Sequence, residues 1–338
     1  MAGVIILCVN VGSSTIKYSV FERGDSLTLR LLNTGTLEGV HTDVLFKDHA
    51  EQGVPAPQAI GHRIVHGGPE YFDPVRLTPK VRQDLQGVIH FAPLHMPQEL
   101  AAIDAIAARH PEIPQVLCFD TAFHHRLPEI AKRFPLPEDY WNRGIRRYGF
   151  HGLSYEYIVS EIGPQLGKRT IIAHLGNGAS MVALLDGQPV ETTMGLTPAG
   201  GIMMGTRAGD LDPGIYVHIE RMTGMSTDDF ESLVNKKSGL LGVSGLTADM
   251  RKLEDAPDNP RAVLAIEMYC YIARKHIGAL SAVLGGLDTL VFTAGIGENS
   301  KLVRDKICEG LDYLKPKVIV QPTNEDLVIA RHVARLLS

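Results

Sequence analysis

Three short glycine-rich segments carry residue types that bind phosphate: residues 10–15 (Asn-Val-Gly-Ser-Ser-Thr), 176–180 (Gly-Asn-Gly-Ala-Ser) and 295–299 (Gly-Ile-Gly-Glu-Asn). Glycine lets the main chain approach a ligand closely, so that consecutive N–H groups can point at an anion. Near the first segment, hydroxyl groups add donors and Lys17 adds a positive charge. One such turn is common in ordinary strand hairpins, but three in one chain favour a nucleotide held between two domains.

The better-known phosphate motifs are absent from the sequence. A Walker A loop needs Gly-Lys followed by Ser or Thr, whereas Gly167-Lys168 is followed by Arg169. The dinucleotide pattern G-x-G-x-x-G and the hydrolase pattern G-x-S-x-G are also missing. Phosphate binding in this chain is therefore expected at turns of the hairpin kind.

Two arginines lie in glycine-rich surroundings. Arg63 belongs to residues 61–68 (Gly-His-Arg-Ile-Val-His-Gly-Gly), and Arg207 stands between Gly205 and Gly209. A guanidinium group offers five donors to a carboxylate or phosphate, and a fixed one suits an anion whose charge changes during a reaction. For Arg63 an ordinary structural salt bridge is the alternative interpretation.

Histidines and aspartates accompany these arginines. His62 and His66 have a spacing that also occurs in metal sites, but the β-branched residues between them predict an extended segment and no H-E-x-x-H glutamate is present. Asp212-Pro213 is typical of a helix start, with Asp at the N-cap and Pro at N1. His151 lies between two glycines and is either a packed structural residue or part of a site.

Asp120 follows an apolar run directly, and the carboxyl ends of strands are the usual place for chemistry in open α/β sheets. With Thr121 and His124 it forms a polar cluster. Two arginines, one aspartate, several histidines and three phosphate turns together indicate phosphoryl transfer, which depends on positioning, charge neutralisation and Mg²⁺ more than on covalent chemistry.

The elements that must position these residues alternate between strands and helices. An internal echo at an offset of 166 residues places Ile5-Ile6 on Ile171-Ile172 and Gly12 on Gly178, which favours two related domains with a boundary near residue 148. Residues 290–297 repeat the strand-and-glycine theme a third time. We expect strands at residues 4–9, 16–21, 116–119 and 170–174, and helices at residues 82–88, 99–109 and from about residue 154.

Composition fits an ordinary globular chain of 338 residues, with 44% hydrophobic and 21% charged residues. Lys plus Arg number 33 and Asp plus Glu 38, so the formal net charge of −5 gives no basic surface for nucleic acid. No run of about 20 apolar residues predicts a membrane span, and no cationic segment of a signal peptide opens the chain. The four cysteines are far apart, which is typical of reduced thiols in a cytoplasmic protein.

These motifs together resemble the acetate kinase (acetokinase) family, whose members move phosphate between ATP and a short-chain carboxylate. The resemblance runs from Val9 to Arg331. It implies an α/β, duplicated actin-like or hexokinase-like (ribonuclease H-like) fold of two domains with the active site in the cleft between them. Residues 1–148, joined by a C-terminal helix at about 326–338, would form the N-terminal domain, and residues 149–325 the nucleotide-binding and dimerisation domain of a homodimer.

The resemblance also implies residue roles. Arg63 and Arg207 would grip the carboxylate and the transferring phosphoryl group, and Asp120 would orient the substrate. Contacts to phosphoryl oxygens, the methyl pocket, the nucleotide and Mg²⁺ or Mn²⁺ would come from further groups. They are His151 and His95 for the phosphoryl oxygens; Val65, Leu94, Phe150 and Pro198 for the pocket; Lys17, Asn177, Gly178, Asp249, Met250, Arg251, Gly295, Ile296, Gly297 and Asn299 for ATP; and Asn10 and Glu325 for the metal.

Three alternatives remain open at this stage. A propionate or butyrate kinase differs from an acetate kinase by little, because one methylene changes discrimination by only about 1–3 kcal/mol; the presence of Val65 favours acetate. A sugar kinase would need a roomier and more polar pocket. A non-catalytic ATP-binding switch would lack the paired arginines. Two departures from the family pattern lie near the site, Met96 in place of an asparagine and Ala199-Gly200 in place of a bulkier pair.

Overall fold

The computed structural model describes residues 3–12, 15–24, 28–39, 45–46 and 53–337. They divide into two compact units. Unit 1 is drawn from Met1–His125, Phe150–Tyr157 and Asn324–Ser338, and unit 2 from Arg126–Gly149 and Ile158–Thr323. The chain crosses between the units after His125, Gly149, Tyr157 and Thr323, so residues 126–149 are counted with unit 2 and residues 324–338 with unit 1. A single domain boundary near residue 148 stays a prediction.

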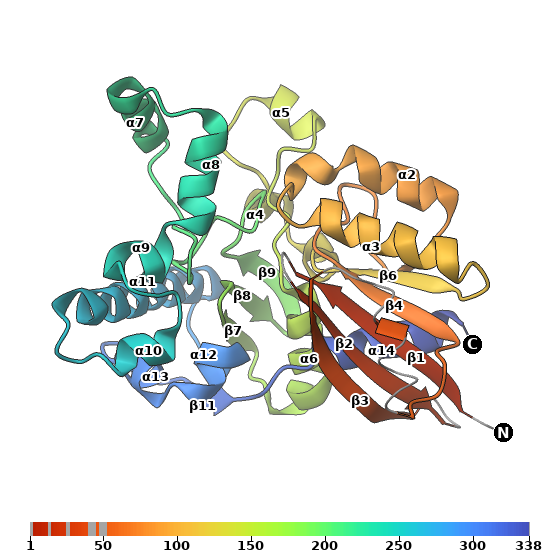
Figure 1. The fold of residues 1–338 in the computed structure, drawn as a ribbon. Coiled ribbons are helices and arrows are strands. Elements are labelled where there is room, and N and C mark those ends of the chain that lie inside the picture. Colours follow the sequence, from red (N-terminus) through yellow and green to blue (C-terminus); the bar gives the residue numbers. More distant parts are fainter. Residues whose placement is uncertain (1–2, 13–14, 25–27, 40–44, 47–52, 338) are drawn as a thin grey trace. The chain divides into compact units, whose positions relative to one another are not determined.

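Within the described residues, unit 1 is built on a six-stranded sheet in the order β3-β2-β1-β4-β6-β5. β1 is antiparallel to β2 and parallel to β4, and β4 is parallel to β6 (Figure 1). The strands are β1 (Val4–Val11), β2 (Thr15–Arg23), β3 (Leu29–Glu38), β4 (Ala59–Ile64), β5 (Val75–Arg76) and β6 (Gln115–Phe119).

Side chains of β1 alternate between the two faces of this sheet, and both faces are buried at this strand. Ile6 and Cys8 pack against helix α14 (Glu325–Leu336), whereas Leu7 and Val9 belong to the core on the side of helix α3 (Met96–Arg109). The chain's two ends therefore meet in one core (Figure 1). The remaining helices of unit 1 are α2 (Pro79–Gly87), η2 (Ile89–Phe91), η3 (Ala122–Arg126, whose last residue is counted with unit 2) and the first residues of α6 (Gly152–Ile162).

Unit 2 repeats the plan. Its five strands in the described residues have the order β11-β10-β7-β8-β9, with β7 antiparallel to β8 and parallel to β10. This is the order of β6-β4-β1-β2-β3 with the same strand directions, so the duplication predicted from the 166-residue echo is confirmed. The strands are β7 (Arg169–Leu175), β8 (Ala179–Leu185), β9 (Gln188–Thr192), β10 (Thr289–Thr293) and β11 (Lys317–Val320).

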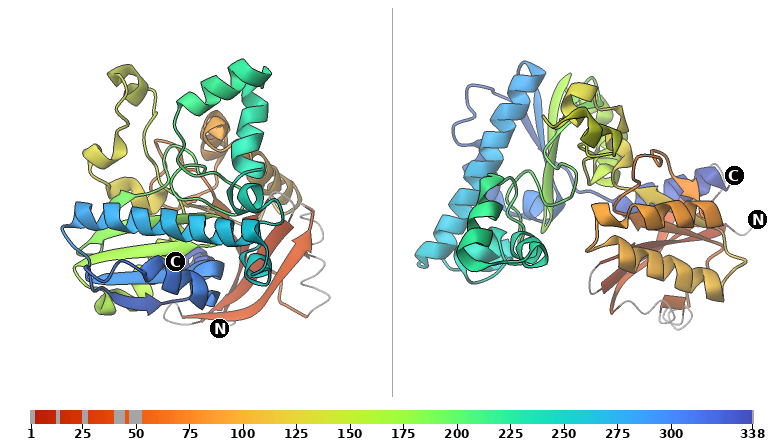
Figure 2. Two further views of the ribbon diagram at one scale, coloured as in Figure 1. Left: turned by 90° about the vertical axis from the view of Figure 1, so that its left-hand side faces the viewer. Right: turned by 90° about the horizontal axis from the view of Figure 1, so that it is seen from above.

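The long helix α11 (Pro260–Leu284) lies across β7 and β8, as Figure 2 shows, and also contacts α9, α10 and α13. The other helices of unit 2 are α4 (Glu129–Lys132), α5 (Glu138–Asn142), η4 (Gly163–Gln165), α7 (Gly214–Thr223), α8 (Thr227–Lys236), α9 (Gly239–Ser244), α10 (Met250–Glu254), α12 (Ala294–Asn299) and α13 (Lys301–Cys308).

The third glycine segment differs from the prediction. Residues 295–299 form no hairpin turn: they belong to α12, which begins directly after the parallel strand β10. The Glu298 carboxylate accepts hydrogen bonds from the main-chain N–H groups of Ala294 (2.8 Å) and Thr323 (3.2 Å), which fixes the helix start. A parallel strand must be followed by a crossover rather than by a hairpin, and this explains the difference.

Three helix starts also differ by a few residues. α2 begins at Pro79 with Thr78 as its N-cap, and α3 begins at Met96. α7 begins at Gly214, one residue later than predicted, with Pro213 at the N-cap position; the Asp212 side chain accepts from Gly214 N at 2.8 Å. All four cysteines are free thiols, and none of the described helices is long and apolar enough to cross a membrane.

Candidate active site

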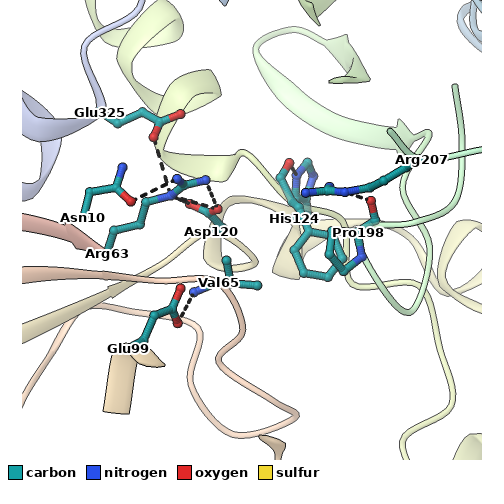
Figure 3. Close-up of polar contacts among 10 residues, drawn as sticks. Asn10, Arg63, Val65, Glu99, Asp120, His124, Pro198, Arg207 and Glu325 are labelled. Carbon is teal, nitrogen blue, oxygen red and sulfur yellow. Dashed lines mark hydrogen bonds and ion pairs between the residues drawn. The ribbon is translucent and has the colours of Figure 1, made fainter. Parts of the chain in front are cut away.

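The centre of the candidate site in unit 1 is a salt bridge between the ends of two neighbouring strands. β4 and β6 are parallel, so Arg63 near the end of β4 lies beside Asp120, which follows β6 directly. Arg63 donates from Nε to Asp120 Oδ1 (3.0 Å) and from Nη2 to Oδ2 (2.6 Å) (Figure 3). Asp120 is 1% exposed, and the two parallel hydrogen bonds fix the guanidinium plane.

Two further oxygens approach the same guanidinium group. Asn10 Oδ1 accepts from Arg63 Nη1 at 3.3 Å, and Glu325 Oε2 lies 3.5 Å from Nε (Figure 3). Burial disfavours the charged form of Arg63, but Asp120 and Glu325 offset that effect and raise the arginine pKa well above its ordinary value. Arg63 therefore stays a cation at every pH at which the protein is folded.

The oxygen set around Arg63 fits a magnesium ion only in part. Mg²⁺ prefers oxygen ligands and usually binds one or two protein carboxylates together with water and substrate phosphates. Asn10 and Glu325 supply such oxygens, but both lie against Arg63. No group of three His, Cys, Asp or Glu side chains suited to a metal exists among the described residues. The residues fit an ion that nucleotide phosphates and water would mainly ligate.

A buried carboxyl group that the sequence did not single out lies close by. Glu99, on α3, is 3% exposed and accepts a hydrogen bond from Val65 N at 3.1 Å. Burial raises the pKa of Glu99 to about 8, the hydrogen bond from Val65 and the charge of Arg63 lower it, and the charge of Asp120 raises it. The sequence signal was an acidic residue on an alanine-rich helix, which by itself indicates only a solvated position.

The histidine pair of residues 61–68 serves packing. His62 is buried and its Nε2 lies 2.7 Å from Gln115 Oε1; burial lowers its pKa to about 4, and the bond with Gln115 opposes that shift. His66 Nδ1 accepts from Gly68 N at 2.8 Å, and the ring stacks on Phe91. One ring nitrogen of each histidine therefore has a partner within the protein.

The predicted pocket residues of unit 1 are buried or half-buried. Val65 is 7% exposed and Phe150 1%. Leu94 and His95 are half-buried just before α3, with His95 at its N-cap position. Their contact with a substrate stays a prediction.

His151 has an unusual backbone. Its φ is +59°, in the left-handed region that a side chain rarely adopts, and the residue is 8% exposed. The next residue, Gly152, donates from its N–H to Asp120 O at 2.8 Å, and a Cβ at Gly152 would lie 2.3 Å from that same oxygen. Only glycine permits this close approach.

In unit 2, Arg207 lies in a loop packed by glycines. Its Nη1 donates to Pro198 O at 3.0 Å (Figure 3), and its main-chain carbonyl accepts from Met204 N at 3.1 Å. A Cβ at Gly205 would lie 2.2 Å from Asn177 Oδ1, so the arginine loop packs directly against the second glycine turn. The expectation of a glycine-bounded arginine describes this loop correctly. The place of Pro198 in a methyl pocket stays a prediction.

A pocket of about 550 Å³ lies within unit 2. Most of the predicted nucleotide residues line it, together with five that were not predicted. The predicted ones are Asn177, Asp249, Met250, Arg251, Gly295, Ile296 and Asn299, and the others are Gly176, Thr247, Ala248, Glu254 and Ser300. Within the described chain, Gly178 and Gly297 are not among the lining residues.

The other predicted nucleotide residues have different surroundings. Gly178 accepts from Gly176 N at 3.0 Å and closes the turn between β7 and β8, and Gly297 packs α12 near Phe292 and Leu175. Lys17 is an exposed residue of β2 opposite Asn10 in unit 1. Ser13 and Ser14 of the first turn lie outside the described residues.

Comparisons with known proteins show the family of the chain. The profile of the Acetokinase family matches residues 36–318. An acetate kinase of Rhodopseudomonas palustris is 46% identical, with 98% of each chain covered. Among solved structures, the chain is similar to acetate kinase of Porphyromonas gingivalis (35% identity, TM-score 0.89, 99% and 100% covered). It is also similar to a propionate kinase of Francisella tularensis (33%, TM-score 0.88, 98% and 99% covered).

The fold, the paired strand-end residues and these full-length similarities point the same way: the chain belongs to the acetokinase family.

Proposed function

We propose that this protein is an acetate kinase that transfers the γ-phosphoryl group of ATP to acetate, giving acetyl phosphate and ADP. The observation that carries the proposal is the Arg63–Asp120 pair, fixed at neighbouring strand ends of unit 1 in a chain of this family. The pocket of about 550 Å³ in unit 2 supports the proposal, because its volume is in the range of small-molecule sites.

In the proposed reaction, an acetate oxygen attacks the γ-phosphorus, the new O–P bond forms, and the bond to the β–γ bridging oxygen breaks in line with it. Bound Mg²⁺ or Mn²⁺ would neutralise phosphate charge. Arg63 and Arg207 donate to the oxygens on which negative charge develops. The bidentate bond of Asp120 to Arg63 favours a positioning role for this carboxylate, because acetate is already an anion and needs no base.

A second candidate is a propionate kinase, because the chain is also similar to the propionate kinase of Francisella tularensis. The choice depends on the volume left beside Val65 and Phe150, and one methylene changes discrimination only about 10- to 200-fold. Acetate is preferred here because Val65 keeps a branched side chain at the predicted methyl pocket.

A hydroxamate assay tests these proposals. Purified protein is incubated with ATP and Mg²⁺ plus acetate, propionate or butyrate, and hydroxylamine traps the acyl phosphate. The highest kcat/KM with acetate supports the first proposal, and the highest with propionate supports the second. ATP binding without carboxylate-dependent turnover would instead indicate a non-catalytic switch. Omitting Mg²⁺ and then adding Mn²⁺ tests the metal requirement.

We also propose that the protein forms a homodimer through unit 2 and works in the cytoplasm. Helix α11 exposes Leu264 (54%), Met268 (41%) and Tyr271 (64%), which follow one another at helical spacing and form an apolar stripe. Helices α7 and α8 contain no buried residue. The free thiols are consistent with a reducing compartment.

A further inference from the structure

The strained backbone of His151 is held by its neighbours within unit 1. A φ of +59° places this residue in the left-handed region, where a residue with a Cβ is disfavoured by about 1–2 kcal/mol, or roughly 5- to 30-fold in population. Such a conformation persists only where surrounding contacts determine it. The contacts that do so can be identified from the two peptide groups on either side of His151.

Each of these peptide groups has its own hydrogen bond. The preceding group, which contains the Phe150 carbonyl, accepts from His124 Nε2 at 2.9 Å. The following group, which contains the Gly152 N–H, donates to the main-chain carbonyl of Asp120 at 2.8 Å. The angle φ of His151 describes rotation from the first peptide plane and ψ rotation to the second. With both planes anchored, neither angle is free to change.

The His124 ring is itself firmly placed. It lies in η3, is 1% exposed, and makes edge-to-face contacts with Phe123 and Tyr155, each with a centroid distance of 5.6 Å. A main-chain hydrogen bond from His124 N to Thr121 O (3.2 Å) ties it to the segment that begins at Asp120. The strand end that carries Asp120 therefore also carries the group that orients Phe150.

The chemistry of the contact determines the tautomer of the ring. A carbonyl oxygen can only accept, so Nε2 of His124 must carry the hydrogen. Burial lowers the pKa of His124 to about 4, although the bond to Phe150 opposes this shift, so the ring is neutral at ordinary pH. Within the described part of the chain, Nδ1 is buried without a hydrogen-bond partner.

We infer that His124 is a positioning residue: its neutral Nε2–H···O=C bond to Phe150 holds His151 in the left-handed conformation and so aims the His151 ring for phosphoryl transfer. The same bond also fixes Phe150, a predicted wall of the methyl pocket. The inference rests on the proposed acyl-phosphate chemistry for its kinetic part. Its structural part, the tautomer and the conformation of His151, does not depend on activity.

The kinetic test compares three variants. His124→Ala removes the donor, and we expect kcat to fall about tenfold or more with little change in the KM for ATP, because the preferred backbone of residue 151 then turns the ring away. His124→Gln keeps an N–H donor near the position of Nε2, and we expect it to recover most of kcat. His332→Ala removes another buried histidine of unit 1, which lies on α14 and contacts Glu156 of α6. We expect this variant to keep unchanged turnover per folded molecule.

A double mutant separates positioning from general damage. If His124 acts through His151, then His124→Ala lowers kcat no further in a chain that already carries His151→Ala. Additive losses in the double mutant, or equal losses in His124→Ala and His332→Ala, would overturn the inference. If the wild-type protein forms no acyl phosphate from any carboxylate, it is the proposed function that fails.

Nuclear magnetic resonance then tests the structural part alone. In protein labelled with ¹⁵N at histidine, the His124 ring should remain the neutral Nε2–H tautomer from pH 5 to 9. The ring resonances of His151 should move in His124→Ala and stay in place in His332→Ala. A protonated or Nδ1–H ring at His124, or unmoved His151 resonances in His124→Ala, would contradict the inference.

Discussion

At the scale of single residues, the two arginines of the candidate site come from a strand end and from a glycine-rich loop. Arg63 is held by three oxygen-bearing side chains in unit 1, whereas Arg207 in unit 2 is held by the carbonyl of Pro198. The first arginine is therefore neutralised within its own unit. Arg207 Nη1 also lies 3.7 Å from the Met204 sulfur, and in the proposed reaction this guanidinium donates to the transferring phosphoryl group. That role predicts a large kinetic effect at Arg207.

Arg207→Ala should lower kcat by about 10²–10³, the usual cost of removing one donor to a transition state, which corresponds to roughly 2.7–4 kcal/mol. The reason is that alanine cannot donate to the phosphoryl oxygens on which negative charge develops in the proposed reaction. Arg207→Lys should recover little, because an ammonium group lacks the planar pair of donors. The hydroxamate assay measures the rates, and circular dichroism checks the fold.

The matched control is Arg143→Ala, which removes an exposed arginine of the same unit and should leave kcat unchanged. Near-normal turnover in a folded Arg207→Ala protein would argue against the proposed function.

Glu99 predicts a specific pH dependence of stability. Its pKa is about 8 in the folded protein against 4.5 ordinarily, so the folded state binds the proton more tightly than the unfolded state. The contribution of Glu99 to the free energy of unfolding is therefore greatest below about pH 4.5 and is lost as the pH rises toward 8. Glu99→Gln retains an acceptor for Val65 N and removes the titration.

Between pH 5 and 8, the free energy of unfolding of the wild type should fall relative to Glu99→Gln by more than about 1.4 kcal/mol, the equivalent of one pKa unit. Urea unfolding at four pH values in this window measures the difference. The exposed Glu70→Gln variant serves as the control for loss of one charge and should run parallel to the wild type. A constant difference between wild type and Glu99→Gln would contradict the assigned shift.

At the scale of elements, the sequence predicts those strands and turns that depend on residues close together in the chain. The apolar runs before Gly12 and Gly176 are strands β1 and β7, and each is followed by its hairpin partner. Residues 295–299 belong to α12 instead of a hairpin turn. The start of this helix is fixed by the hydrogen bond from Thr323 N to the Glu298 carboxylate, a contact across 25 residues. Such a tertiary contact has no signal in a short window of sequence.

Local position in the chain also decides which residues of the candidate site can be predicted. Asp120 was predicted from its place after an apolar run, a local property. The roles of Glu99 and His124 depend on burial and on partners 34 and 26 residues away, Val65 and Phe150. A charged residue on a helix and a histidine in a polar cluster look alike whether they are buried or exposed.

The docking of α14 on the sheet of unit 1 depends on a glycine in β4. A Cβ at Gly61 would lie 2.4 Å from Ile329 Cγ2 and 2.7 Å from Val333 Cγ2. Gly61→Ala should therefore destabilise the protein by about 1–3 kcal/mol, since the helix must shift outward. Because α14 begins at Glu325, the KM for Mg²⁺ should rise as well.

Urea unfolding and a magnesium titration of activity check both effects. Gly87→Ala is the matched control, because a Cβ there meets nothing within 4 Å and alanine is favoured in a helix. If Gly61→Ala and Gly87→Ala were equally stable, the close packing of α14 on β4 would be disproved.

At the scale of the whole molecule, duplication has given two units with the same strand order, but different helices cover the two sheets. In unit 1, α14 and α3 cover both faces of the sheet, and the strand ends carry Arg63 and Asp120. In unit 2, α11 crosses β7 and β8 and still presents an apolar outer stripe. A stripe of large apolar side chains on a long, otherwise well-packed helix is typical of an interface between copies.

This stripe predicts the oligomeric state. Met268→Lys with Tyr271→Asp places charges of opposite sign on adjacent turns of the exposed face of α11, where the side chains are 41% and 64% exposed in a single chain. If two copies associate through this face, burial of these charges should convert a dimer into a monomer without unfolding unit 2. Light scattering after size-exclusion chromatography gives the mass of each protein.

Ile130→Lys, at a 90% exposed residue of α4, is the control and should remain a dimer. A wild-type monomer, or a double variant that stays dimeric, would show that this stripe is not the interface.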